Sequence, residues 1–356
     1  MDHALRRQRL AARLEEWGYE AFLVTHLPNV RYLSGFTGSN AQLLITGNGG
    51  LFFTDGRYIE QSRRQVPGVE RVIYSKDFPK VMAEACRRFG VQRLGFEGEG
   101  ITQKGYTDIA SEVRAEFVSV VGAVEGLRRM KDPEELALIE RAQAITDQAL
   151  EAVLPRLTEG TTEREAALWL DRAMEDLGAE KEAFETIAAF GENAAEPHHS
   201  PSDRALKRGD VLKLDFGARY EGYHADMTRT VAFGESPDEL REIYEVVRKA
   251  QQAGIDAVRG GVTGGEADRA ARSVIDDAGY GEAFSHGLGH GVGLEIHESP
   301  TLRKDGEDVV PVNAVVTVEP GVYVPGVGGV RIEDMVEVLE DGCRPLPSST
   351  KEFVVL

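Results

Sequence analysis

The sequence has only two cysteines, Cys86 and Cys343, and they are far apart with no CxxC or similar ligand spacing. A disulfide framework and a thiolate metal site are therefore excluded as the basis of this fold. Long apolar runs are also missing, because no stretch reaches the roughly 18 apolar residues that cross a bilayer. The first residues place leucines and alanines at helical spacing among charges, unlike a secretory signal. We therefore expect a soluble protein of the reducing cytoplasm that does not bind membranes.

Basic residues are fewer than acidic residues. The chain carries 41 Lys and Arg against 60 Asp and Glu, a net charge of −19. Such a field repels a phosphate backbone, so nucleic acid is not an expected partner. With 42% hydrophobic and 28% charged residues, the composition is that of a globular protein and not of a disordered chain. A length of 356 residues fits two domains.

Helical and strand patterns alternate over residues 1–122, which predicts a complete α/β domain. The pattern then changes: Asp132 is a plausible N-cap, Pro133 suits a first helical turn, and a long helix is expected to about Leu154. We place the domain boundary between Val121 and Asp132, giving domains 1–126 and 127–356 in an α/β (α+β) protein. The expected helices are 2–17, 58–65, 78–89, 103–114, 133–154, 162–178, 237–259 and 264–279; the expected strands of the first domain are 21–25, 41–46, 51–54, 71–74, 94–97 and 117–121.

The second domain repeats one order: two helices, then strands that carry a pair of carboxylates. In VLKLDFGARYEGYHADMTRTVAF, alternating apolar residues flank Tyr220 to Tyr223, which predicts a hairpin with Gly222 in the turn. If Tyr220 faces Tyr223, Asp215 faces Thr228, and Asp226 lies on the same face. Two like charges on one face repel unless a cation lies between them. A pair of solvated aspartates on an outer face is the alternative for this segment alone.

Two further segments argue for a metal. SHGLGHGVGLEIHESP places His286, His290 and His297 in a glycine-rich run, where a helix is improbable and neutral imidazoles are available as ligands. Glu319 and Glu333 each end a β-branched run, and a buried carboxylate without a cation is costly. Arg331 can neutralise one acid but not four. A carboxylate-rich site for two divalent cations is therefore predicted.

The order Asp215, Asp226, His290, Glu319, Glu333, in the contexts LDFGARYEGYHADMTRT, GHGVGLEIHE, VEPGVY and VRIED, resembles the five-ligand signature of the pita-bread metallopeptidases. This family includes methionine aminopeptidase, Xaa-Pro aminopeptidase and Xaa-Pro dipeptidase (prolidase). The first domain resembles the creatinase/prolidase N-terminal domain, so the resemblance covers the whole chain. It implies a pita-bread catalytic domain with an internal pseudo-twofold duplication. It also implies that Asp215 binds one metal, that His290 and Glu319 bind the other, and that Asp226 and Glu333 bridge both.

The resemblance further implies catalytic roles for His198 and His297, with His286 and Arg331 near the substrate; His199, beside His198, is the less favoured choice. Glu319 is also our candidate to take the proton of the attacking water. The metals are expected to be Mn²⁺, with Co²⁺ or Zn²⁺ as alternatives.

Because methionine aminopeptidases usually lack such a first domain, the resemblance implies the Xaa-Pro branch. We expect an Xaa-Pro aminopeptidase acting on small peptides with proline at the second position, with Xaa-Pro dipeptidase as the alternative. A methionine aminopeptidase and a non-catalytic pita-bread binding module are more remote alternatives. A homodimer is also implied. Tyr32, Phe36, Asp55 and Arg57 are expected either to reach a neighbouring subunit's site or to serve the local fold.

Overall fold

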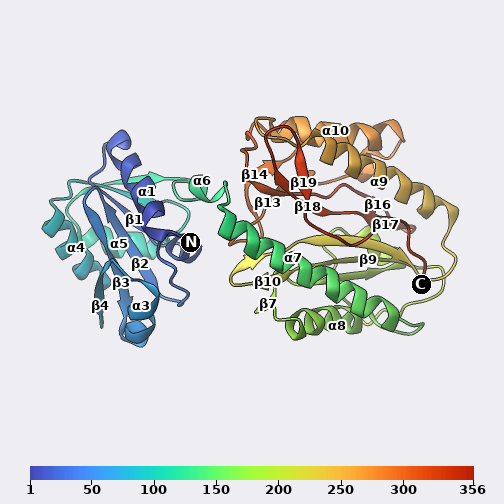
Figure 1. The fold of residues 1–356 in the computed structure, drawn as a ribbon, viewed down its shortest axis with the longest axis horizontal. Coiled ribbons are helices and arrows are strands. Elements are labelled where there is room, and N and C mark those ends of the chain that lie inside the picture. Colours follow the sequence, from blue (N-terminus) through green and yellow to red (C-terminus); the bar gives the residue numbers. More distant parts are fainter. The chain divides into compact units, whose positions relative to one another are not determined.

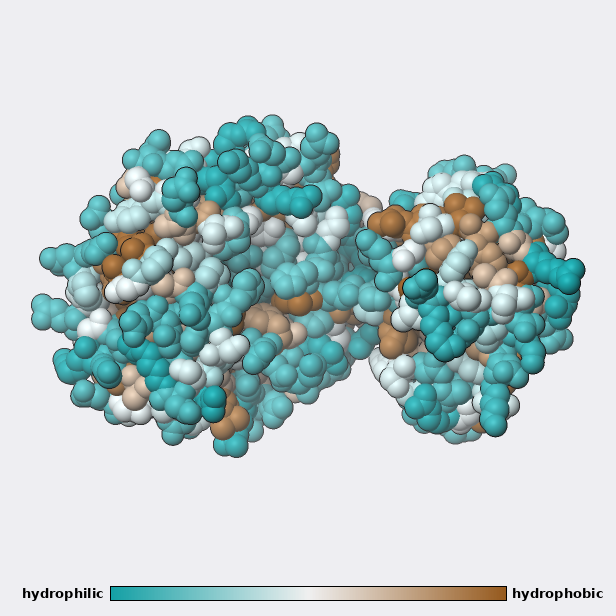
Figure 2. Space-filling view, turned by 180° about the vertical axis from the view of Figure 1, so that it is seen from behind, coloured by the Kyte–Doolittle hydropathy of each residue, from teal (hydrophilic) through white to brown (hydrophobic).

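The computed structural model describes residues 1–356 and divides the chain into two compact units, Met1–Arg128 and Arg129–Leu356 (Figure 1). Helices and strands are mixed in both units, which confirms the predicted α/β (α+β) class. None of the helices combines the length and the apolar character needed to cross a bilayer. Hydrophilic side chains cover most of the face seen in Figure 2, with smaller hydrophobic patches between them.

The first unit is built on a six-stranded mixed sheet with the order β4-β3-β2-β1-β5-β6. The β1–β2 and β2–β3 pairs are antiparallel, and the β1–β5, β5–β6 and β3–β4 pairs are parallel. Its strands are β1 Ala21–Val24, β2 Ala41–Thr46, β3 Gly49–Asp55, β4 Glu70–Tyr74, β5 Arg93–Glu97 and β6 Glu116–Val120. Its helices are α1 His3–Trp17, α2 Leu27–Ser34, η1 Gly56–Tyr58, α3 Ile59–Gln65, α4 Phe78–Phe89, α5 Gln103–Glu112 and α6 Glu125–Arg128.

Helices cover this sheet on both faces because successive strand residues point to opposite sides. Leu23 and Phe53 pack into one cluster with Met82 of α4. On the other face, Phe36 lies 5.0 Å from Phe52, ring centroid to ring centroid. Tyr32 is buried beneath Arg6, whose guanidinium carbon is 4.0 Å from its ring centroid. Tyr32 and Phe36 therefore serve the core of their own unit.

The second unit contains two helix pairs, each followed by strands, as the repeated order of the sequence predicted. α7, α8 and α10 begin with capping boxes formed by Asp132, Thr162 and Thr263 with the glutamates three residues on. The helices are α7 Pro133–Val153, η2 Leu154–Arg156, α8 Glu163–Asp176, η3 Gly191–Ala195, α9 Asp238–Ala257, α10 Gly264–Asp277 and η4 Gly281–Ala283. The strands are β7 Lys181–Glu182, β8 Ile187–Phe190, β9 Val211–Phe216, β10 Ala218–Tyr220, β11 Tyr223–His224, β12 Met227–Ala232, β13 Gly289–Gly291, β14 Glu298–Leu302, β15 Val315–Val318, β16 Gly321–Val324, β17 Gly328–Arg331, β18 Asp334–Val338 and β19 Cys343–Pro345.

Each helix pair covers its own set of strands (Figure 1). Leu212, Leu214 and Phe216 of β9 join the core beneath α7 and α8. Val316 and Val318 of β15 join the core beneath α9 and α10. The residues between them in sequence point the other way, so the middle of the unit receives one face of β9, β12 and β15.

Candidate active site and metal centre

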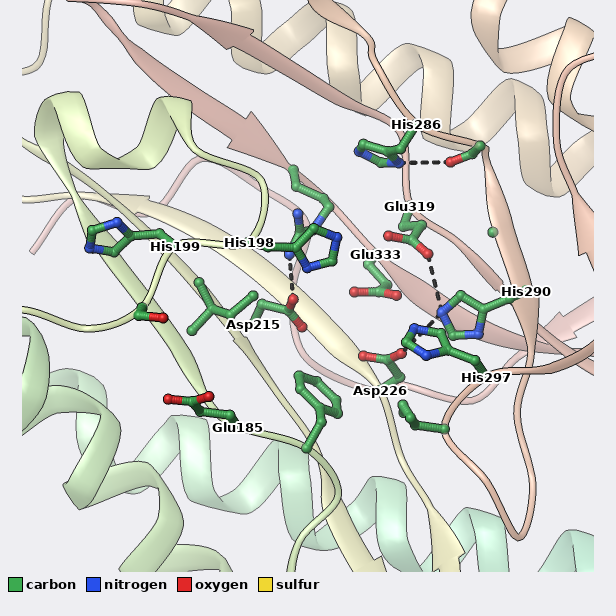
Figure 3. A pocket seen from close by; sticks show the side chains of 17 residues that line it. Glu185, His198, His199, Asp215, Asp226, His286, His290, His297, Glu319 and Glu333 are labelled. Carbon is green, nitrogen blue, oxygen red and sulfur yellow. Dashed lines mark hydrogen bonds and ion pairs between the residues drawn. The ribbon is translucent and has the colours of Figure 1, made fainter. Parts of the chain in front are cut away.

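One pocket of about 390 Å³ in the second unit collects every predicted site residue. Figure 3 shows the labelled side chains gathered around the pocket from strands and loops of both halves of the unit. The predicted residues in its lining are Asp215, Asp226, His290, Glu319, Glu333, His198, His297, His286 and Arg331. The structure therefore brings together side chains that lie more than a hundred residues apart in the chain.

The hairpin that carries Asp215 and Asp226 has the predicted register. Tyr220 pairs with Tyr223 across the β10–β11 turn, and Asp215 pairs with Thr228 between β9 and β12. Glycine is required at position 217 because a Cβ there would lie 1.8 Å from the carbonyl oxygen of Ala225. The close approach of the two backbones places both carboxylates in the pocket.

His290 on β13 faces two of the carboxylates. Its Nδ1 is 3.0 Å from the carbonyl oxygen of Gly291 and donates to it, which leaves Nε2 free for the pocket. Nε2 is 3.6 Å from Oδ2 of Asp226 and 3.4 Å from Oε1 of Glu319. The Thr317 hydroxyl donates to the same Glu319 oxygen at 3.1 Å. Such neighbours orient metal ligands in many proteins.

The four carboxylates are held close together without enough positive charge. Burial, then repulsion by Glu333 and Asp215, raises the pKa of Asp226 well above its usual value. Burial and repulsion by Glu319 and Asp215 do the same to the pKa of Glu333. Burial raises the pKa of Glu319 to about 7, although Arg331 opposes the shift. Acids in this arrangement are stable as anions only when cations bind among them.

The donor set fits divalent cations. Asp226, His290 and Glu333 each offer a ligand atom, and these atoms lie within 4.8 Å of one another. Oδ1 of Asp215 is buried and accepts no hydrogen bond, which leaves its lone pairs directed at the pocket. Carboxylate oxygens with one imidazole suit hard or borderline divalent metals.

Arg331 is the cationic centre of the pocket wall. Its guanidinium donates to Oδ2 of Asp215, to the Thr228 hydroxyl at 2.9 Å and to the Tyr323 hydroxyl at 3.0 Å. It also donates to the carbonyl oxygen of Pro197 at 3.1 Å. The Thr228 hydroxyl in turn donates to Oε2 of Glu333 at 2.6 Å. Arg331 thus orients two carboxylates from segments that are distant in sequence, Asp215 directly and Glu333 through Thr228.

His198 and His199 lie in different surroundings although both border the pocket (Figure 3). The ring of His199 is 2.7 Å from Oε2 of Glu196 and 2.9 Å from Oε2 of Glu163. Burial of this ring lowers its pKa, but the two carboxylates outweigh burial and raise it. His198 lines the same pocket as Asp215 and forms no ion pair with a carboxylate (Figure 3). This placement favours His198 as the residue that meets a substrate.

Sequence reasoning missed three polar residues of the site. Lys213 on β9 is fully buried, and its Nζ donates to the carbonyl oxygens of Ala194, Glu196 and Pro197. The Tyr323 hydroxyl joins Arg331 to Nε2 of His286, which is 2.8 Å away. Thr228 bridges Arg331 and Glu333. The period-two alternation of side chains places Lys213 and Thr228 on the face of Asp215, and it is the one sequence signal that could have predicted these two residues.

Two family models match the chain. Residues 137–340 match metallopeptidase family M24, and residues 6–130 match the creatinase/prolidase N-terminal domain. The Bacillus subtilis (strain 168) protein named uncharacterized peptidase YqhT is 40% identical, with 99% of this chain and 100% of that protein covered.

Two solved structures are similar over nearly the full length. The Xaa-Pro dipeptidase from Bacillus anthracis has a TM-score of 0.98 at 39% identity, with both chains covered completely. The X-Pro aminopeptidase from Thermotoga maritima MSB8 has a TM-score of 0.89 at 37% identity, covering 97% of this chain and 100% of that one.

Proposed function

The chain belongs to metallopeptidase family M24 and carries a creatinase/prolidase N-terminal domain, and from this membership we propose that it is an Xaa-Pro aminopeptidase. It is a metal-dependent hydrolase by family. The proposed reaction removes the first residue of a peptide whose second residue is proline. Two relatives with solved structures bear Xaa-Pro peptidase names, one a dipeptidase and the other an aminopeptidase.

The charges of the pocket support the aminopeptidase. A dipeptidase must receive the carboxylate that ends its substrate, and a cation is the ordinary partner of a buried carboxylate. Arg331 is the one Arg or Lys in the pocket lining. Its donors are already directed to Asp215, Thr228, Tyr323 and Pro197. A peptide that continues beyond proline needs no such cation at this place.

The remaining lining suits the proline ring. Phe184, Ile187 and Ile296 supply apolar side chains next to the carboxylates. Proline presents an apolar ring and has no N–H at its peptide nitrogen, so an apolar wall costs it no hydrogen bond. The free α-amine of the first residue is a cation that the acidic cluster attracts.

In the mechanism, Asp215, Asp226, His290, Glu319 and Glu333 would hold two divalent cations. When bound, such cations lower the pKa of a water molecule and polarise the scissile carbonyl. Glu319 accepts the proton of the attacking water and passes it to the proline nitrogen, which must be protonated to leave. His198 and His297 donate hydrogen bonds to the carbonyl oxygen as negative charge develops. Manganese is the cation we propose, because oxygen ligands with one imidazole suit it.

Xaa-Pro dipeptidase is the second candidate. The observation that favours it is the TM-score of 0.98 with the Bacillus anthracis Xaa-Pro dipeptidase. Two proteins with such similar folds can still accept peptides of different length, because their active-site loops can differ. Fold similarity alone therefore does not decide between aminopeptidase and dipeptidase. The proposed homodimer rests on the family resemblance, and light scattering on the purified chain tests it.

The deciding experiment is product analysis with the manganese-loaded protein on an Xaa-Pro dipeptide and an Xaa-Pro-Xaa tripeptide. Release of the first residue from the tripeptide is the result we expect. Cleavage of the dipeptide alone would establish the dipeptidase. No turnover of either, with metal bound, would overturn the Xaa-Pro assignment in favour of methionine-type substrates or a binding module. Glu319→Gln is the control, since it keeps the shape of the side chain but cannot accept the proton.

A further inference from the structure

A buried ion pair outside the pocket reaches the loop that carries His297. Nζ of Lys131 is 3.1 Å from Oε2 of Glu298, and their side chains are 2% and 6% exposed. Lys131 precedes the N-cap residue of α7, whereas Glu298 begins β14 directly after His297. The pair therefore connects a segment far away in sequence to the neighbour of a predicted active-site residue.

Glu298 closes the loop between the two histidines. Its Oε1 accepts a hydrogen bond from the Glu295 amide at 3.1 Å, and its backbone pairs with Gly291 between β13 and β14. Gly293 has no Cβ, and a Cβ there would lie 2.7 Å from Oε1 of Glu298. From the other side, the amide of His224 donates to the carbonyl oxygen of Gly293 at 2.9 Å. The loop between His290 and His297 is therefore bound at Gly293 by His224 and at Glu295 by Glu298.

His297 itself has few constraints. Its ring makes no hydrogen bond in the structure, and its clearest contact is edge-to-face with the His290 ring at 4.4 Å between centroids. The position of this ring consequently depends on the backbone beneath it. The carboxylate of Glu298 binds that backbone at the Glu295 amide and also binds Lys131.

A buried ion pair is seldom the most stable way to fill a core, because both charges lose their hydration. Its directional contacts can instead select one backbone arrangement. We propose that Lys131 is a positioning residue for the peptidase reaction: by binding Glu298 it fixes the loop from Gly291 to Glu298, and with it the ring of His297 against His290. This role rests on the proposed function, but its structural part does not.

The test compares Lys131→Met, Glu298→Gln, the double variant and Lys131→Arg with the unaltered chain. Hydrogen exchange of residues 289–300 is measured on metal-free protein, so it is independent of any activity. We expect exchange at the Glu295 amide to rise about tenfold or more in Lys131→Met, because the carboxylate that holds it loses its ion pair with Lys131. Lys131→Arg keeps the charge and should restore much of the protection.

Kinetics on an Xaa-Pro-Xaa peptide supply the second arm. In Lys131→Met, kcat should fall about tenfold or more while KM changes less than about twofold, since the loop orients a reacting group. The double variant should lose no more kcat than either single variant, because both act through one contact. If Lys131→Met fails to fold, the double variant, which removes both charges of the pair, carries the test.

Val153→Ala is the matched control, because it lowers stability from the α7 core without touching the pocket. It should leave both kcat and the exchange of residues 289–300 unchanged. The proposal is overturned if Lys131→Met behaves like this control, or if the losses of the two single variants add in the double variant. If the unaltered chain cleaves no Xaa-Pro peptide, the proposed function fails while the exchange measurement still decides the role of Lys131.

Discussion

Arg331 and Asp215 are 116 residues apart in sequence, and the guanidinium of the first donates to one carboxylate oxygen of the second. The other oxygen of Asp215 is buried and accepts no hydrogen bond from the protein. One side of the carboxylate is therefore neutralised by the protein, and the other side is left for a cation. This division of one carboxylate is the feature on which the site's charge balance depends.

Arg331→Lys should impair both stability and activity. A lysine keeps the charge but cannot reach Asp215, Thr228, Tyr323 and Pro197 together, because it lacks the planar fork of donors. We expect a loss of about 1–3 kcal/mol in the free energy of unfolding and a fall of about tenfold or more in kcat/KM. Urea denaturation and peptide kinetics measure the two.

Arg204→Lys is the matched control, since Arg204 also binds a carboxylate through two nitrogens, that of Asp210, outside the pocket. It should lower stability while leaving kcat/KM within about twofold. Equal losses of kcat/KM in the two variants would contradict the role given to Arg331.

Thr228→Val should weaken metal binding. The valine keeps the shape but removes the hydroxyl that donates to Glu333 and accepts from Arg331. Loss of such an orienting contact typically costs about 10–100-fold in metal affinity, which titration calorimetry with Mn²⁺ measures. Thr230→Val is the control, because the Thr230 hydroxyl bonds only the backbone of Arg331. Equal affinities in the two variants would count against an orienting role for Thr228.

His199→Gln should destabilise the protein most at low pH. The pKa of His199 is raised in the folded state, so its imidazolium contributes stability below the unfolded pKa of about 6.5. That contribution is lost as pH rises through the raised folded pKa. We expect a loss of about 1–3 kcal/mol at pH 6 that shrinks toward pH 9, measured by urea denaturation.

His198→Gln should behave in the opposite way, lowering kcat with little change in the unfolding free energy, because its ring borders the pocket. A loss of kcat confined to the His199 variant would exchange the roles assigned to these neighbours.

Without metal, the protein should become less stable as pH rises from about 4.5 to about 7. Burial raises the folded pKa of Glu319 to about 7. In this window the folded state keeps a proton that the unfolded state, with a pKa near 4.3, has released, so rising pH favours unfolding. The change for this one group is on the order of 3 kcal/mol. Thermal unfolding in EDTA at pH 5 and pH 7.5 measures it.

Added Mn²⁺ should abolish or reverse that trend, because bound cations favour the ionised carboxylates. Glu319→Gln in EDTA should show a smaller dependence, since the titrating group is gone. A metal-free protein equally stable at both pH values would mean that the carboxylates are less crowded than the structure indicates.

The hairpin shows how far local pattern carries a prediction. Tyr220, Gly222 and Tyr223 define the turn, and a period of two then places Asp215 opposite Thr228 without further information. Most helices were predicted to within a few residues because their apolar periodicity and N-caps agree. That Glu319 and Glu333 share a metal site with these aspartates was predicted from the cost of burying acids without a cation. The choice of His290 among the histidines came from the family resemblance.

Other features had no signal in the sequence. α2, Leu27–Ser34, was not predicted because it is short and contains Pro28 and Asn29, which are typical of turns. Lys213 interrupts an apolar strand, and its partners are backbone carbonyl oxygens of a separate segment. Every residue has such an oxygen, so the sequence does not reveal which ones bind Lys213. The choice between His198 and His199 likewise depends on Glu163 and Glu196, whose positions only the fold determines.

The alternation of side chains along β9 limits the insertions and deletions that this strand can accept. Its even-numbered residues fill the core under α7 and α8, while Asp215 lines the pocket and Lys213 lies on the same face of the strand. An insertion of one residue before Leu212 that was not absorbed by a bulge would turn Asp215 into the core and a leucine into the pocket. Single-residue insertions and deletions within β9 should thus be eliminated in any library selected for activity.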